Sequence, residues 1–67
     1  MKVIINNREI SIFRGATVRD AVMAYSLESY LQLQNGQLIV TDRFNNHLES
    51  DGALSDGQYI KLIKSEK

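Results

Sequence analysis

The segment Gly15–Tyr25, Gly-Ala-Thr-Val-Arg-Asp-Ala-Val-Met-Ala-Tyr, predicts an amphipathic helix that begins at Thr17 and ends near Tyr25 or Ser26. Thr17 can cap this helix by accepting a hydrogen bond from the backbone N–H of Asp20, and the Asp20 carboxylate can accept one from the N–H of Thr17 in return. Four apolar residues share one face at the helical spacing: Val18, Ala21, Val22 and Tyr25. A helix this short is not stable alone, so it needs a sheet to pack against.

The residues before the helix predict a β-hairpin. Lys2–Asn6 reads as a strand with Val3 and Ile5 on one face, and Arg8–Phe13 as a returning strand in which apolar and polar side chains alternate. Asn6-Asn7 lies between them and suits a two-residue turn, because asparagine tolerates the positive φ that such turns require.

The residues after the helix predict three further strands. Tyr30–Gln34 and Leu38–Thr41 are expected to form a second hairpin, because Asn35-Gly36 between them is a strong turn signal. Leu27 is expected to fold back onto the last turn of the helix. The last strand is predicted at Gln58–Lys64, after a polar and turn-rich segment, and a polar tail at 65–67 is expected to fray.

These elements predict a single two-layer α+β domain over residues 1–67, with one helix across one face of a sheet. Phe13 and Phe44 are expected to cap the rim of the core. The predicted core consists of apolar residues from all these elements: Val3, Ile5, Ile10, Ile12, Val18, Ala21, Val22, Leu54, Ile60 and Leu62.

Composition excludes several classes of function. The 67 residues include no cysteine, which rules out disulfides, thiolate metal sites and iron–sulfur clusters. The net charge is zero, which disfavours a general nucleic-acid binder, since these carry a basic excess. No segment has the pattern of a signal peptide or a membrane span, so a cytoplasmic protein without a membrane partner is expected.

Residues able to carry chemistry are few. His47 is the only histidine, and no nucleophile motif accompanies it, so we expect an exposed turn residue rather than a catalytic one. Four carboxylates lie in the loop-rich region, at Asp42, Glu49, Asp51 and Asp56. Their spacing does not match a calcium loop, and Asp-Gly pairs are typical of turns. No catalytic, metal or cofactor site is therefore predicted, and the protein is not expected to be an enzyme.

Two motifs carry a resemblance to a known family. Gly15-Ala16-Thr17-Val18 begins the helix, and the stretch Leu54–Leu62, Leu-Ser-Asp-Gly-Gln-Tyr-Ile-Lys-Leu, leads into the last strand. With the Asn6-Asn7 and Asn35-Gly36 turns, the chain resembles the small bacterial sulfur carriers ThiS and MoaD over nearly its whole length. These carriers are ubiquitin-like β-grasp proteins, so the resemblance implies a mixed sheet of four to five strands with one helix packed across one face.

In that family, activity depends on a C-terminal Gly-Gly tail, which an adenylating enzyme of the ThiF/MoeB type activates before it receives sulfur. This chain ends Ile63-Lys64-Ser65-Glu66-Lys67 and lacks the tail. The resemblance therefore implies a non-enzymatic protein-binding module, monomeric or weakly dimeric, that docks onto such an enzyme or a neighbouring domain. Two alternatives stay open: a genuine sulfur carrier for thiamine or molybdopterin biosynthesis whose tail is missing from this chain, and a module similar to RNA-contacting TGS domains.

The resemblance also implies where a partner would bind. The first and last strands of a β-grasp sheet are neighbours, so apolar residues that alternate with their core residues would share the open face. Those residues are Ile4, Tyr59 and Ile63, edged by Lys2 and Lys61. Exposed contiguous apolar area often marks a protein contact. The predicted protein-binding residues are therefore Ile4, Tyr59, Lys61 and Ile63.

Overall fold

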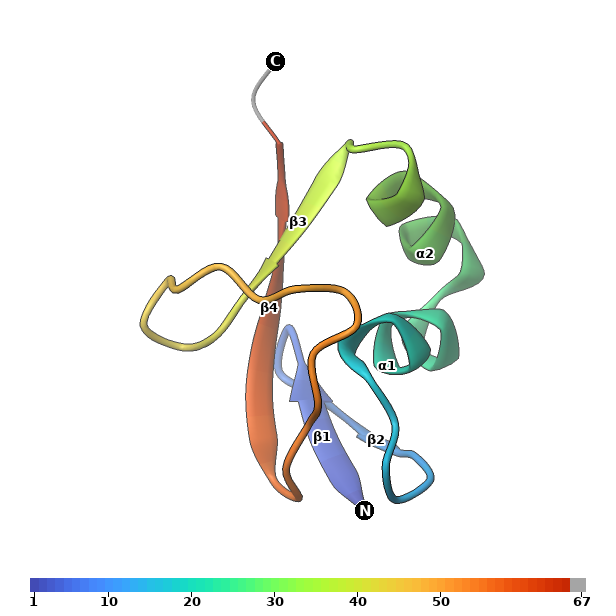
Figure 1. Cartoon of the computed structure of the whole chain (residues 1–67), viewed down its shortest axis with the longest axis vertical. Helices are drawn as coiled ribbons and strands as arrows, with labels where there is room; N and C mark the ends of the chain where they lie inside the picture. The colour runs from blue at the N-terminus through green and yellow to red at the C-terminus, as the bar shows by residue number, and fades with distance from the viewer. Residues whose placement is uncertain (66–67) are drawn as a thin grey trace.

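The computed structural model describes residues 1–65 and has two layers, a four-stranded sheet and two helices on one of its faces (Figure 1). The α+β class expected from the sequence is confirmed. The elements are β1 (Lys2–Ile5), β2 (Arg8–Ser11), α1 (Val18–Tyr25), α2 (Leu27–Gln34), β3 (Leu38–Thr41) and β4 (Gln58–Lys64). Of the expected polar tail, Glu66 and Lys67 lie outside the described residues.

The sheet is mixed, with the strand order β2-β1-β4-β3. β1 and β4 are parallel neighbours in the centre, and Ile4 lies beside Tyr59 in their register. β2 and β3 pair antiparallel with β1 and β4 and form the two edges. The predicted hairpin of β1 and β2 is confirmed, and Asn6 and Asn7 both have positive φ, 49° and 71°, in the turn between them.

Helix α1 has the predicted start. Thr17 is its N-cap, and both halves of the capping box with Asp20 are present. The Thr17 N–H donates to Asp20 Oδ2 at 3.0 Å, and the Asp20 N–H donates to Thr17 Oγ1 at 3.4 Å. The bond from the Thr17 N–H, followed by one that the Thr17 hydroxyl donates to the same Asp20 oxygen at 3.1 Å, holds the pKa of Asp20 below its usual value of 3.8. Val18, Ala21 and Val22 are buried against the sheet, as their spacing predicts.

The segment after α1 differs from the prediction. It forms a second helix, α2, so the strand expected at Tyr30–Gln34 is wrong, and so is the expectation of a single helix. Ser26 ends α1 and caps α2, its Oγ accepting from the Ser29 N–H at 3.2 Å. Glutamate, leucine and glutamine favour a helix, and that preference outweighs the short apolar alternation. Leu27 begins the new helix and is 63% exposed, so it does not fold back onto α1.

Asn35-Gly36 ends α2 rather than forming a hairpin. Asn35 is the C-cap, and Gly36 follows with a φ of +77°, the left-handed conformation common after a helix. The same dipeptide suits both roles because each needs a residue that tolerates positive φ. The predicted turn position is therefore right, but the predicted hairpin is wrong.

The core lies between α1 and the sheet. Eight of the ten predicted core residues are buried, while Ile10 and Leu62 are half-buried and pack against them. Ala16, Leu38 and Val40 complete the buried apolar set. Phe13 and Phe44 do not cap the core: they are 63% and 75% exposed, and both lie in the loops that follow β2 and β3.

Candidate functional site

The open face of the sheet, opposite the helices, brings together the predicted binding residues. Val3, Ile5 and Ile60 are fully buried on the helix side, so the residues that alternate with them face the other way. Ile4 and Tyr59 are adjacent in the parallel register and half-buried. Ile63 follows on the same face, towards the end of β4, and is 38% exposed.

The structure adds Ile39 to this group. Leu38 and Val40 are buried, so Ile39 between them faces the open side, and it pairs with Ile63 of β4. We call the four apolar side chains Ile4, Ile39, Tyr59 and Ile63 the open-face patch. Sequence analysis missed Ile39 because the run Leu38-Ile39-Val40 is apolar throughout and does not indicate its inward side.

Tyr59 is held from two directions. Its hydroxyl donates to Oδ1 of Asn7 at 3.0 Å, in the turn between β1 and β2. The Arg43 guanidinium lies 5.6 Å from the centre of its ring, within range of a cation–π interaction. The ring is therefore fixed in place before any partner binds, which lowers the entropy lost on binding.

The loop after β3 places two polar residues at the patch. Asp42 shapes this loop: its Oδ1 accepts from the N–H groups of Phe44 and Asn46 at 2.8 and 3.0 Å. Bonds from Asn46 are the main cause that holds the pKa of Asp42 below its usual value of 3.8. The loop carries Arg43 to Tyr59, and Asn45 accepts a hydrogen bond from Lys61. Sequence analysis missed Arg43 and Asn45, because only the folded loop brings them to the sheet.

Among residues 1–65, the open face carries more positive than negative side chains. Lys61 and Arg43 lie around Tyr59, and Lys2 occupies the same face of β1 as Ile4. Glu9 also lies on this face and pairs with Lys2 at 3.4 Å, where both side chains are largely exposed. A partner surface with apolar side chains and carboxylates would therefore complement this face.

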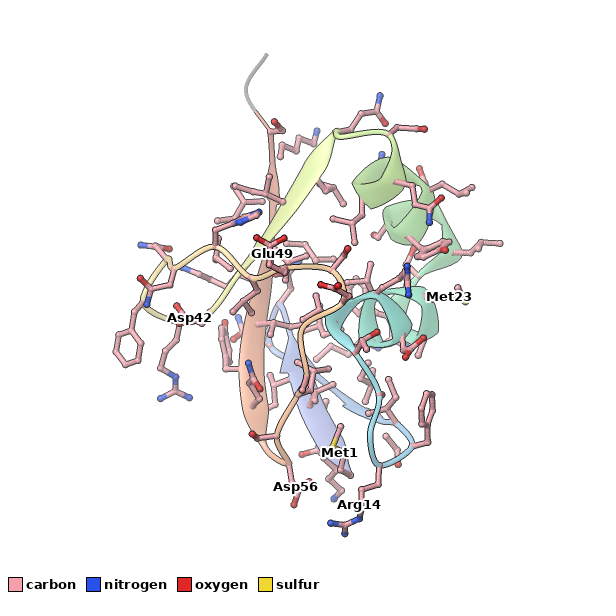
Figure 2. The ribbon with its side chains drawn as sticks, in the orientation of Figure 1. Met1, Arg14, Met23, Asp42, Glu49 and Asp56 are labelled. Atoms are coloured by element: carbon pink, nitrogen blue, oxygen red, sulfur yellow. The ribbon has the colours of Figure 1, made fainter. Side chains whose placement is uncertain are left out.

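His47 and the carboxylates do not form a reactive cluster in residues 1–65. His47 is exposed and borders a surface cavity of about 400 Å³ between α2, β3 and the following loop, which Arg19 and Glu49 also line. Asp42, Glu49 and Asp56 lie apart on the molecule (Figure 2). Asp56 accepts from the Lys2 N–H at 2.7 Å, so it supports the start of β1. Within the described residues, no three histidine or acidic side chains are grouped as metal ligands.

The backbone N–H groups at the start of α1 already have hydrogen-bond partners within the chain. The N–H groups of Val18 and Arg19 donate to the carbonyl oxygens of Gly52 and Ser50 at 3.0 and 2.8 Å. The donors that could bind an anion at this helix end are therefore used within the chain. These bonds also attach the long loop after β3 to the helix layer.

Across residues 1–65, neither helix has the length and apolar character needed to cross a membrane. Comparison of the chain with protein-family models, with the curated proteins and with the solved structures found no match. The candidate site consists of a fixed aromatic ring among aliphatic side chains, with basic groups around it.

Proposed function

We propose that this chain is a ubiquitin-like β-grasp protein of the ThiS/MoaD type that acts as a non-enzymatic protein-binding module. The strand order supports the fold: a central parallel pair, β1 and β4, is flanked by antiparallel strands, and the helices cover one face. The motifs at 15–18 and 54–62 support the family. The partner is an adenylating enzyme of the ThiF/MoeB type or a neighbouring domain.

The open-face patch is the observation that carries this proposal. Two pairs of neighbouring apolar residues, Ile4 with Tyr59 and Ile39 with Ile63, lie on the sheet face that the helices leave uncovered. Aromatic residues fixed in an apolar surface are typical centres of protein interfaces. Lys61 and Arg43 beside Tyr59 would pair with acidic side chains of the partner and orient it.

The proposal is tested with the double variant Ile4→Asp, Ile63→Asp and the ThiF/MoeB-type enzyme as binding partner. Two carboxylates in the patch would be buried without partners, so affinity should fall by about a hundredfold or more. The matched control is Met23→Asp, Leu31→Asp, which changes two exposed apolar residues of the helix layer and should bind normally. Circular dichroism checks that each variant folds.

Equal binding by the folded patch variant and the wild type would refute the open face as the docking site. A short single-stranded RNA serves as the competing ligand. Salt-dependent RNA binding that needs Arg43 and Lys61, without binding of the enzyme, would replace this proposal with the RNA-contacting alternative.

A further inference from the structure

The two edges of the sheet differ in how they are covered. At β3, the following loop turns back beside the strand, as the yellow segment next to β3 shows (Figure 1). The Leu48 N–H donates to the Val40 carbonyl at 2.8 Å, and the Asp42 N–H donates to the Asn46 carbonyl at 3.0 Å. The end of this edge, from Val40 to Asp42, is therefore paired with the protein's own chain.

The β2 edge is bare. Residues 10 and 12 point their backbone groups towards β1, as the mutual bonds of 2.8 Å between Met1 and Ile12 show. Backbone groups alternate along a strand, so the N–H and C=O of Glu9 and Ser11 point outward. Within residues 1–65, neither Glu9 nor Ser11 has a backbone hydrogen-bond partner on that side. β2 contains no proline, and its pairing with β1 is regular through all four residues.

An unpaired strand edge is a template for another strand. We propose that β2 pairs antiparallel with β2 of a second copy of this chain, about a two-fold axis at Ile10, to form a continuous eight-stranded sheet. In this register Glu9 lies opposite Ser11 of the second copy. Each such pair exchanges two hydrogen bonds, so the two-fold axis pairs all four outward groups of each strand.

The register follows from the side chains and from the bonds already made. Centring the axis on Glu9 would place two carboxylates directly opposite each other, which is unfavourable. Centring it on Ser11 would require the Phe13 carbonyl, which already accepts from the Ala16 N–H at 3.2 Å. Centring it on Ile10 avoids both problems and places two half-buried isoleucines side by side.

Charge also favours a second copy as the occupant. The chain has no net charge, so two copies do not repel each other over long distances. Lys2 and Ser11 are cross-strand neighbours on the open face, and Ser11 would lie beside Glu9 of the second copy. Across the strands of the joined sheet, these neighbouring side chains therefore place no like charges directly opposite each other.

Dimerisation would give the proposed function a second binding site. A two-fold axis perpendicular to the sheet places both open faces on the same side. Five strand spacings separate one β4 from the other, a distance of about 24 Å. A dimeric partner could then engage both patches at once and gain avidity. Only this consequence rests on the proposed function; the dimer itself rests on β2.

The first test measures the wild-type chain alone. Four ordinary hydrogen bonds correspond to a dissociation constant of about 1 mM, so sedimentation equilibrium should show the mass rising towards a dimer near that concentration. Amide exchange of Glu9 and Ser11 should slow over the same range. A monomeric mass throughout, with concentration-independent exchange at both amides, would overturn the proposal.

Single cysteines test the register, since the chain has none of its own. Ile10→Cys should form a disulfide-linked dimer under mild oxidation, because facing non-hydrogen-bonded residues have Cα atoms about 4.5 Å apart. Ser11→Cys is the matched control, since its two copies would be more than about 7 Å apart and should cross-link much more slowly. Faster cross-linking of Ser11→Cys than of Ile10→Cys would contradict the proposed axis.

Proline provides the backbone test. Ser11→Pro removes an outward N–H that is not used within residues 1–65, so a folded variant should dimerise at least about tenfold more weakly. Unchanged dimerisation of that variant would refute pairing through β2. If Ser11→Pro does not fold, Glu9→Pro removes the equivalent outward N–H and decides in the same way. Because no partner enzyme is present, these results are independent of the patch variants.

Discussion

At the scale of single residues, Thr41 has an unusual environment. It is 3% exposed, and its hydroxyl has no hydrogen-bond partner within residues 1–65. A buried hydroxyl without a partner lowers stability, because it loses its bond to water without gaining another. Thr41→Val removes that hydroxyl and keeps a similar shape. We therefore expect the free energy of unfolding to rise by about 1 kcal/mol, measured by urea denaturation.

Thr41→Ser is the matched control for this prediction. It keeps the hydroxyl and removes the buried methyl group, so the free energy of unfolding should fall by about 1 kcal/mol. A Thr41→Val variant that is destabilised as much as Thr41→Ser would contradict the unpaired hydroxyl.

Residue orientation was predicted correctly in β1 and left open in β3. Val3 and Ile5 are buried as predicted, with the half-buried Ile4 on the opposite face. Ile39 lies in an unbroken apolar run, so its place on the open face follows only from the pairing of β3 with β4. Arg43 belongs to a polar loop, and its contact with Tyr59 depends on backbone bonds to Asp42.

At the scale of elements, the conformation of the loop after β3 is stabilised by the charged carboxylate of Asp42. Its carboxylate accepts hydrogen bonds from Asn46 and Phe44, and these keep its pKa below 3.8 in the folded chain. The stabilisation is complete above the unfolded pKa and is lost as the pH falls through the lower folded pKa. We expect the melting temperature to fall as the pH decreases below about 4, with Asp20 contributing in the same direction.

The variant Asp42→Asn distinguishes the contribution of this loop to the acid sensitivity from that of the rest of the molecule. The amide does not titrate, so the variant should lose less stability than the wild type over the same fall in pH, although it is less stable at neutral pH. Melting curves of both proteins at several pH values measure this difference. Parallel curves for the two proteins would show that Asp42 does not contribute to the acid sensitivity.

Helix α2 shows why one element was not predictable from its pattern. Leu31 and Leu33 alternate with glutamines, as in a strand, whereas the half-buried residues Tyr30 and Leu33 are three apart, as on a helix. The decisive residue is Ser26, which ends α1 and caps α2 at once. The helix propensity of the residues in this segment and the Ser26 cap, rather than the spacing of apolar residues, therefore account for the helix.

At the scale of the whole molecule, the two-layer arrangement could be predicted, but the pairing in the centre of the sheet could not be derived from local pattern. β1 and β4 lie more than 50 residues apart in the chain, and their parallel register is set by the packing of Ile5 and Ile60 under α1. Only the resemblance to ThiS and MoaD predicted that they are neighbours. That pairing creates the open-face patch, since it brings Ile4 beside Tyr59.

Amide shift mapping can locate the surface through which this chain docks onto its partner. The isotope-labelled chain is titrated with the unlabelled ThiF/MoeB-type enzyme, and the amide signals of all described residues are followed. We expect the signals of the open-face residues to shift or broaden first, while those on α1 and α2 stay unchanged; the open-face residues followed are Ile4, Ile39, Tyr59, Lys61 and Ile63. Changes confined to α1 and α2, or no change at saturating enzyme, would contradict docking through the open-face patch.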